Sequence, residues 1–190
     1  AEGRWTAEKK RRIYESRVLT TRELVDAVLQ TPNQVQTFVM GSAIGVYGDR
    51  GDEKLFESSV GGSPSGFSSE SPSGNPDAFP AGSPIKGKDF LAKVVVDWEN
   101  ELARLNTRAT IRQVIVRTGV VLDNQGGALA KLLPMFMNGL GGPLAGGRNW
   151  MSWIALEDIC RVFQFAITDQ RVRGVINGVA PEPIQNRDFT

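Results

Sequence analysis

Apolar residues near the start of the chain recur at helical spacing. Five of them fall close to a period of 3.6 residues between Thr6 and Pro32: Ile13, Val18, Leu19, Val25 and Val28. This pattern predicts one helix or a pair of helices, which Thr6 can cap and Pro32 must end. A basic run covers residues 9–12. A solvated helix face is favoured for this run, and a phosphate-binding patch is the alternative.

The pattern then alternates between strand and helix. A continuous apolar run followed by a Gly/Ser turn predicts a strand within 35–48, of the kind that is covered on both faces. An apolar stripe at four-residue spacing predicts a helix over 86–105: Phe90, Val94, Trp98 and Leu102. The same reasoning predicts a strand within 108–122, a helix within 126–144 that reaches Pro134 and ends in a glycine turn, a short strand over 149–154, a helix over 156–170 and a last strand and loop over 174–184. Such alternation indicates an α/β protein with a parallel sheet and helices on both faces.

One segment fits neither pattern. Gly, Ser and Pro make up 20 of the 30 residues of 58–87. Such a composition buries too little apolar surface to offset the entropy of ordering the chain. We expect a surface insertion that a protein partner would hold, with Phe67, Phe79 and Ile85 as the anchors.

Composition excludes several classes of site. The 190 residues carry a net charge of +1, which does not favour nucleic acid as a partner, and no apolar run approaches the length of a membrane span. There is no histidine, so Ser-His-Asp and Cys-His catalysis and most zinc sites are excluded. The closest acidic group, Asp49, Asp52 and Glu53, is expected to be a solvated loop, and no metal site is predicted. The lone Cys160 fits a reducing compartment, and its apolar surroundings predict a buried thiol.

Two loops rich in Gly and small hydroxyls follow predicted strands: "GSAIGVYG" and "RTGVVL". In parallel sheets, ligands bind beyond the carboxyl ends of the strands. These loops therefore indicate either a nucleotide site or ordinary turns.

Several stretches resemble the epimerase-family branch of the extended, atypical short-chain dehydrogenases/reductases, some members of which are labelled cell-division-inhibitor-like. They include "SRVLTTRELVDAV", "SAIGVYGDRGD" and "FLAKVVVDWENE", and the run from Arg117 to Asp158 is the most specific. The resemblance covers nearly all of the chain except 58–87. It implies a Rossmann-like fold that binds NADP(H), of which residues 1–190 would be the C-terminal portion. The first strands and the Gly-rich phosphate turn would then lie upstream of this chain.

The resemblance also assigns candidate residues. Ser42 and Tyr47 are the candidate catalytic groups, and Asp158 matches a residue that caps its helix. The expected cofactor-binding positions are Gly41, Ser42, Arg117, Thr118, Gly119 and Val120.

The superfamily's Tyr-x-x-x-Lys pair is replaced here by Phe90 and Val94. A phenyl ring has no exchangeable proton and an isopropyl group has no charge, so the usual acid-base couple is absent. Lys93 lies one residue away, about 100° round the helix, and is expected to point elsewhere. The Arg-Asp pair typical of sugar-nucleotide epimerases is also missing, because Met151 and Ser152 stand in its place. A UDP-sugar substrate is thus poorly supported, unless the nearby Arg148 holds the diphosphate.

Two functions remain open. The first is an atypical NADP(H)-dependent oxidoreductase that takes a proton from Ser42, Tyr47 or water. The second is a non-catalytic accessory or scaffold subunit of a larger assembly, for which chloroplast-associated relatives suggest an organelle membrane complex. The compartments compatible with these readings are the chloroplast stroma and the cytoplasm.

Overall fold

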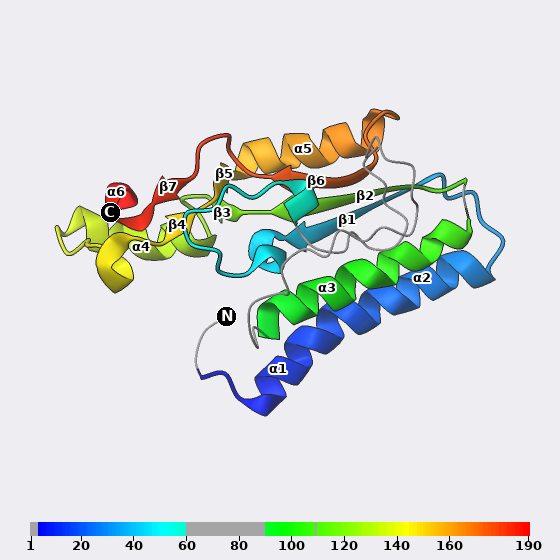
Figure 1. Ribbon diagram of the computed structural model, residues 1–190, viewed down its shortest axis with the longest axis horizontal. Helices are drawn as coiled ribbons and strands as arrows, with labels where there is room; N and C mark the ends of the chain where they lie inside the picture. Colours follow the sequence, from blue (N-terminus) through cyan, green and yellow to red (C-terminus); the bar gives the residue numbers. More distant parts are fainter. Residues whose placement is uncertain (1–3, 60–89, 109) are drawn as a thin grey trace.

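The computed structural model describes residues 4–59, 90–108 and 110–190. Three parallel strands form its main sheet in the order β1-β2-β6 (Figure 1): β1 Thr37–Ala43, β2 Arg112–Thr118 and β6 Gly174–Gly178. The central β2 is almost entirely buried, as expected for a parallel strand covered on both faces. The predicted α/β class with a parallel sheet is confirmed.

Helices cover both faces of this sheet (Figure 1). The helices α2 (Thr20–Gln30) and α3 (Phe90–Ala103) lie on one face, and α5 (Leu156–Thr168) lies on the other. Successive strand residues point to opposite faces, so Met40 packs with the α2 and α3 side chains, whereas Val39 packs with those of α5. The helix α1 (Ala7–Tyr14) continues through a π-helical turn, Glu15–Leu19, directly into α2. The first predicted segment is therefore one continuous helical run.

Shorter elements gather at the end of the main sheet where its strands finish (Figure 1). The strand β3 (Val120–Leu122) pairs in parallel with β5 (Trp153–Ala155), and β4 (Trp150–Met151) pairs antiparallel with β7 (Ile184–Gln185). The helices α4 (Gly127–Met137) and α6 (Asn186–Phe189) flank these strands.

Two segments that were each predicted to hold one strand hold two strands in the structure. The strand predicted over 108–122 is divided at Gly119, where a Cβ atom would lie 2.6 Å from the carbonyl oxygen of Ser152. The strand predicted over 149–154 is also two strands, because β4 and β5 pair in different sheets. The last strand ends at Gly178 and a loop follows it, as predicted for 174–184. Residues 60–87 of the predicted insertion, with Phe67, Phe79 and Ile85, lie outside the described residues.

The prediction of a buried Cys160 is wrong, because its side chain is exposed. Helix α5 turns Ile159 and Ala166 toward the sheet, and both are buried. Cys160 follows Ile159 by one residue, or about 100° round the helix, and so faces solvent. An apolar sequence context misled the prediction, since α5 also exposes Phe165 and Ile167.

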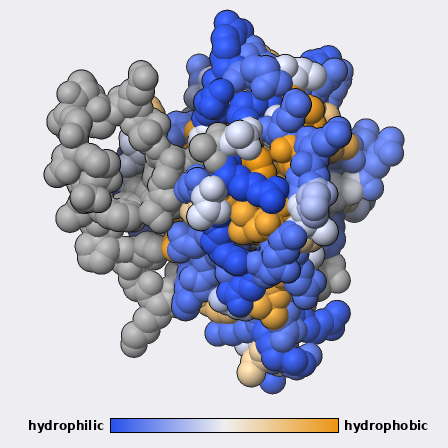
Figure 2. Space-filling view, turned by 90° about the vertical axis from the view of Figure 1, so that its right-hand side faces the viewer, coloured by the Kyte–Doolittle hydropathy of each residue, from blue (hydrophilic) through white to orange (hydrophobic). Residues whose placement is uncertain are grey.

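The end of the molecule where the main strands begin is shown in Figure 2. Apolar residues group in the middle of this face and hydrophilic ones surround them. The predicted site residues follow the strands and therefore lie at the opposite end. Within the described part of the chain, no helix is long and apolar enough to cross a membrane. No group of three or more acidic or cysteine side chains in the same ranges is arranged to hold a metal ion.

Candidate functional site

The three main strands bring polar residues together near their carboxyl ends. Ser42 on β1 lies beside Arg117 on β2, and Arg117 lies beside Asn177 on β6. Side chains at one register level of a parallel sheet point to the same face. Here that face is covered by α3, which contributes Glu99 to the group. The sheet register thus assembles residues that lie far apart in the sequence.

Glu99 is the centre of this buried cluster. Ser42 Oγ donates to Glu99 Oε1 at 2.6 Å, and Arg117 donates to both carboxylate oxygens, through Nε at 3.0 Å and Nη2 at 2.8 Å. The exposed fraction of the side chain is 0% for Arg117 and 2% for Glu99. Burial lowers the pKa of Arg117, but the hydrogen bonds and charge of Glu99 outweigh it and raise that pKa above its ordinary value. The pair is a charged, bidentate contact inside the core.

Tyr47 joins the same cluster from the turn that follows β1. Its hydroxyl donates to Asn177 Oδ1 at 2.6 Å and accepts from Arg117 Nη1 at 3.2 Å. The Arg117 guanidinium also lies 5.2 Å from the centre of the Tyr47 ring. Burial raises the pKa of Tyr47, and the nearby Arg117 offsets this only in part. Tyr47 is therefore a neutral phenol at physiological pH.

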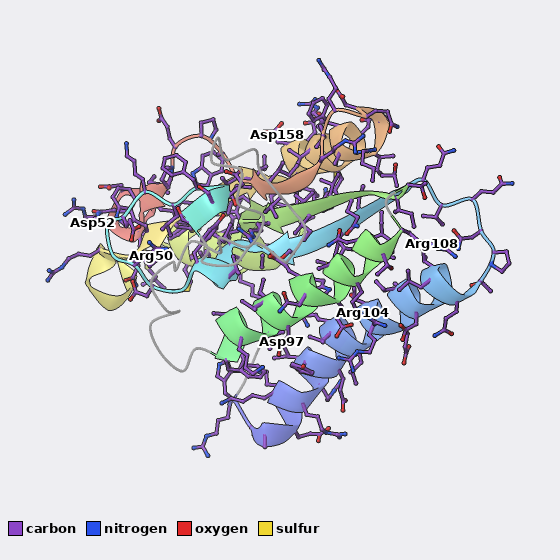
Figure 3. All side chains as sticks on the ribbon, turned by 45° about the vertical axis from the view of Figure 1, so that its right-hand side comes forward. Arg50, Asp52, Asp97, Arg104, Arg108 and Asp158 are labelled. Atoms are coloured by element: carbon purple, nitrogen blue, oxygen red, sulfur yellow. The ribbon has the colours of Figure 1, made fainter. Side chains whose placement is uncertain are left out.

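The loop after β1 is fastened to the same end of the sheet. Arg117 Nη1 donates to the Glu57 carbonyl at 3.1 Å, and the Asn177 backbone N–H donates to Glu57 Oε1 at 2.8 Å. Further along, Trp150 Nε1 donates to Asp52 Oδ1 at 2.6 Å. Figure 3 places Asp52 at the end of the molecule that carries α4 and α6. Glu57 and Asp52 thus attach this loop to the strand ends and to β4.

The sequence analysis did not single out Glu99, Asn177 or Glu57. For Glu99 a signal was present, because it follows Val95 by four residues and precedes Leu102 by three. These spacings place its carboxylate on the buried stripe of α3. A charged residue on a buried stripe requires a partner. Asn177 and Glu57 carry no comparable sequence signal.

Each of the hydroxyl groups near the strand ends donates a hydrogen bond to another group of the protein. Ser42 donates to Glu99, Tyr47 donates to Asn177, and Thr118 Oγ1 donates to the carbonyl oxygen of Val116 at 3.4 Å. A hydroxyl oxygen keeps its acceptor capacity when its proton is used. Ser42 and Tyr47 are buried, so Thr118, which is partly exposed, is the one of these three hydroxyls that offers an acceptor to a ligand.

The backbone N–H groups of the β2–β3 junction are also engaged. The Gly119 N–H donates to the Gly178 carbonyl at 3.1 Å, and the Val120 N–H donates to the Ser152 carbonyl at 2.8 Å. These bonds hold the ends of the main strands against β5 and do not point to a ligand. A donor at this edge would have to come from elsewhere in the protein.

The glycines expected at the cofactor have packing reasons in this chain. A Cβ atom on Gly41 would lie 3.4 Å from the Phe163 ring of α5, and one on Gly119 would lie 2.6 Å from the Ser152 carbonyl oxygen. Gly119 therefore has to be a glycine for the two strands to approach, whatever it binds. The cofactor roles of these two residues remain predictions.

Phe90 and Val94, which are predicted to replace the Tyr and Lys of the superfamily, both lie on α3. Val94 is 2% exposed and packs in the core, and Phe90 is half-buried at the first position of α3. Lys93 pairs with Asp97 at 2.5 Å on the outer side of the helix, with 70% of its side chain exposed. The prediction that Lys93 points away from the Val94 position is confirmed.

Two other predicted residues lie apart from the cluster. Asp158 is exposed in the first turn of α5 (Figure 3), and its Oδ1 accepts from Arg161 Nη1 at 3.2 Å. Helix α5 begins after Ala155 without a side-chain cap, so Asp158 acts through the helix dipole and not as a cap. Arg148 is exposed beside β4.

Comparison with known proteins finds relatives that are similar over nearly the whole of this chain. No family model matches the chain. It is 35% identical over 184 residues to the chloroplastic epimerase family protein SDR39U1 homolog of Arabidopsis thaliana, covering 96% of this chain and 45% of that protein. Among solved structures, human epimerase family protein SDR39U1, crystallised with NADPH, is 30% identical with a TM-score of 0.78. That match covers 98% of this chain and 55% of the human one.

A second solved structure is similar over the whole of the chain. The nucleoside-diphosphate sugar epimerase of Corynebacterium glutamicum is 37% identical with a TM-score of 0.73, covering 100% of this chain and 35% of its own. The chain spans about half the length of the curated relatives it matches. The comparison therefore concerns one part of each of these longer proteins.

Proposed function

We propose that this chain, which belongs to the epimerase-family branch of the extended short-chain dehydrogenases/reductases, forms the carboxyl-terminal portion of a Rossmann-like domain that binds NADP(H). The carboxyl ends of β1, β2 and β6 would hold the nicotinamide end. The observation that carries this proposal is the acceptor oxygen of Thr118, which is partly exposed at the end of β2. A nicotinamide carboxamide offers N–H donors, which suit such acceptors. The NADPH of the human relative supports the choice of cofactor.

The activity that fits this site best is an atypical oxidoreductase. The bound cofactor would supply the hydride, and the protein mainly has to orient it. The protein would not supply the proton in the usual way, because Phe90 has none to give and Ser42 and Tyr47 donate theirs to Glu99 and Asn177. Water or the substrate itself is then the proton source.

A second function is favoured by one specific observation. Val94 is packed in the core and Phe90 partly so, as expected of residues kept for stability. A dinucleotide-binding scaffold in a larger assembly needs the cofactor site and the core but no proton donor. The Gly/Ser/Pro-rich residues 58–87 are the segment through which such an assembly would contact this chain. The name of the Arabidopsis relative supports a chloroplast location for this assembly.

Titration of NADPH fluorescence with the full-length protein tests both functions. Binding followed by NADPH oxidation with any member of a broad carbonyl panel supports the oxidoreductase. Binding without turnover supports the scaffold, and absence of binding contradicts both. Thr118→Ala is expected to weaken NADPH binding severalfold. Thr107→Ala, at the opposite end of the sheet, is the matched control and should leave it unchanged.

A further inference from the structure

The buried cluster near the strand ends contains a chain of hydrogen bonds that runs in one direction. An arginine has donors only, so Arg117 Nη1 donates to the Tyr47 hydroxyl, at 3.2 Å. The Tyr47 oxygen accepts this bond, and its single proton is directed to Asn177 Oδ1, at 2.6 Å. Tyr47 keeps that proton at neutral pH, because burial raises its pKa. The oxygen of the Asn177 amide is therefore fixed toward Tyr47.

This orientation makes the amide nitrogen of Asn177 the free end of the chain. Nδ2 has no hydrogen-bond partner among the described residues. In the same part of the protein, the buried side-chain atoms that lack a partner are Gln113 Oε1 and Gln185 Oε1, so Nδ2 is not buried. Asn177 as a whole is partly exposed. Its two amide N–H donors thus reach the surface in an orientation that the core imposes.

Asn177 lies beside the end of β2 that is proposed to hold the nicotinamide. It pairs with Arg117 and is the last residue but one of β6, and Thr118 is the last residue of β2. The main chain is held there as well, because the Asn177 backbone N–H donates to Glu57 Oε1 at 2.8 Å. Asn177 points to the face covered by α3 and Thr118 to the face covered by α5, so a ligand that meets both lies across the strand ends.

We propose that Asn177 Nδ2 donates a hydrogen bond to the carboxamide oxygen of the bound nicotinamide, and that Tyr47 positions this donor by holding Oδ1. A carboxamide presents one acceptor oxygen as well as N–H donors. Thr118 suits its donors, and Asn177 suits its oxygen. The inference rests on the proposed function, because that function places the nicotinamide at these strand ends.

The backbone of the β2–β3 junction does not supply this donor. The N–H groups of Gly119 and Val120 already donate to the carbonyls of Gly178 and Ser152. A donor for the carboxamide oxygen at these ends therefore has to be a side chain, and Asn177 Nδ2 is the amide nitrogen that the cluster leaves without a partner.

The fixed orientation of the amide matters for such a ligand. An asparagine amide that turns over exchanges its nitrogen and its oxygen. Oδ1 would then face the carboxamide oxygen, and two acceptors would meet. The Tyr47 proton opposes this turn, because Nδ2 in the place of Oδ1 would bring two donors together. Tyr47 and Arg117 thus act on the ligand through the orientation of Asn177.

Isothermal titration of the full-length protein tests the bond with three dinucleotides: NADPH, its thionicotinamide analogue and its 3-acetylpyridine analogue. The first analogue has sulfur, a weak acceptor, in place of the carboxamide oxygen, and the second keeps the oxygen but has no amide N–H. Sulfur should weaken binding by roughly two- to tenfold, which is the contribution of one neutral hydrogen bond. Asn177→Asp exchanges the donor for an acceptor and should remove the preference for oxygen over sulfur.

Further variants separate the roles of the residues. Tyr47→Phe keeps the ring but frees the Asn177 amide, so it should reduce the preference for oxygen over sulfur. Thr118→Ala should keep that preference and lose the preference for NADPH over the 3-acetylpyridine analogue. Asn33→Asp is the matched control, because Asn33 precedes β1 at the opposite end of the sheet. It should bind all three dinucleotides like the parent.

Two results would overturn the inference while NADPH binding remains intact: the parent binds the thionicotinamide analogue as tightly as NADPH, or Asn177→Asp keeps the parent's preference. The preference is a ratio of two affinities of one variant, so a loss of folded protein does not imitate it. Asn177→Ala, which adds no charge, gives the same reading if Asn177→Asp does not fold. Failure of the parent to bind any of the three dinucleotides would instead contradict the proposed function, so the two failures are distinguishable.

Discussion

Removal of the Glu99 charge tests whether the buried cluster holds the candidate site together. Glu99 and Arg117 have side-chain exposures of 2% and 0%, and two hydrogen bonds of 2.8 and 3.0 Å join them. At an effective dielectric constant of about 20, two charges 3 Å apart attract by about 6 kcal/mol. Desolvation of both ions opposes most of that attraction while the pair is intact. Once Glu99→Gln removes one charge, Arg117 stays buried without compensation, and the expected loss of unfolding free energy is about 3–5 kcal/mol.

Thermal and urea unfolding of the full-length protein measure this loss. For a domain of this size, each kcal/mol shifts the melting temperature by about 2–4 °C, so a fall of about 6–20 °C is expected. Glu157→Gln is the matched control, because Glu157 is 75% exposed and pairs with Arg161 on the surface of α5. Such pairs contribute about 0.5 kcal/mol or less. Equal melting temperatures for Glu99→Gln and Glu157→Gln would refute the reasoning.

A double variant isolates the cause. Glu99→Leu combined with Arg117→Met removes both charges and keeps apolar volume in their place. Replacement of a whole buried pair by apolar residues is often close to neutral, whereas removal of one partner is costly. The double variant is therefore expected to lose less stability than Glu99→Gln alone. A loss equal to the sum of the single variants would show that packing, and not the unpaired charge, dominates.

Three further predictions concern the remainder of the fold. Arg171 lowers the pKa of Asp169 to about 2 through hydrogen bonds, so its stabilising contribution is complete above pH of about 4 and is lost as the pH falls toward 2. In Arg171→Gln, an NMR titration should return the pKa of Asp169 toward 3.8. Arg112 donates to three carbonyls at and just beyond the end of α5, so Arg112→Met should cost about 3 kcal/mol in urea unfolding and speed hydrogen exchange in the last turn of that helix. Gly119→Ala should be strongly destabilising, because its Cβ atom would lie 2.6 Å from a backbone oxygen, whereas Gly41→Ala, with a contact of 3.4 Å, should leave the melting temperature within a few degrees of the parent.

Apolar periodicity was sufficient to predict the layers of the fold. Buried faces were predicted from the run Phe38–Met40 and from the stripe through Val94 and Leu102, and the structure confirms both. Periodicity did not predict a strand break that backbone contacts determine. The break at Gly119 arises from a close approach of two chain segments, and no local pattern encodes that approach.

The candidate site was predictable only in part, for a similar reason. Ser42, Tyr47 and Arg117 were visible because they end predicted strands or follow them. Their roles could not be predicted, because each role depends on which atoms form hydrogen bonds with the side chain. The partners that decide this, Glu99 and Asn177, come from a helix and from the last main strand. Sheet register, and not sequence spacing, brings them together.

Two independent features argue against a side-chain proton donor in the candidate site. The predicted replacement of the superfamily's Tyr and Lys by Phe90 and Val94 would remove the usual proton donor and its cationic helper, and the hydrogen bonds of Ser42 and Tyr47 engage the protons of the nearest substitutes. To release its proton to a substrate, Ser42 would have to leave Glu99, and Glu99 would then lose a charge-assisted hydrogen bond inside the core. The substrate of an active enzyme built on this chain must therefore accept hydride without a proton from these side chains. A pH-independent kcat between pH 6 and 9 is thus expected for any turnover, since Tyr47 has a raised pKa and does not titrate in that range.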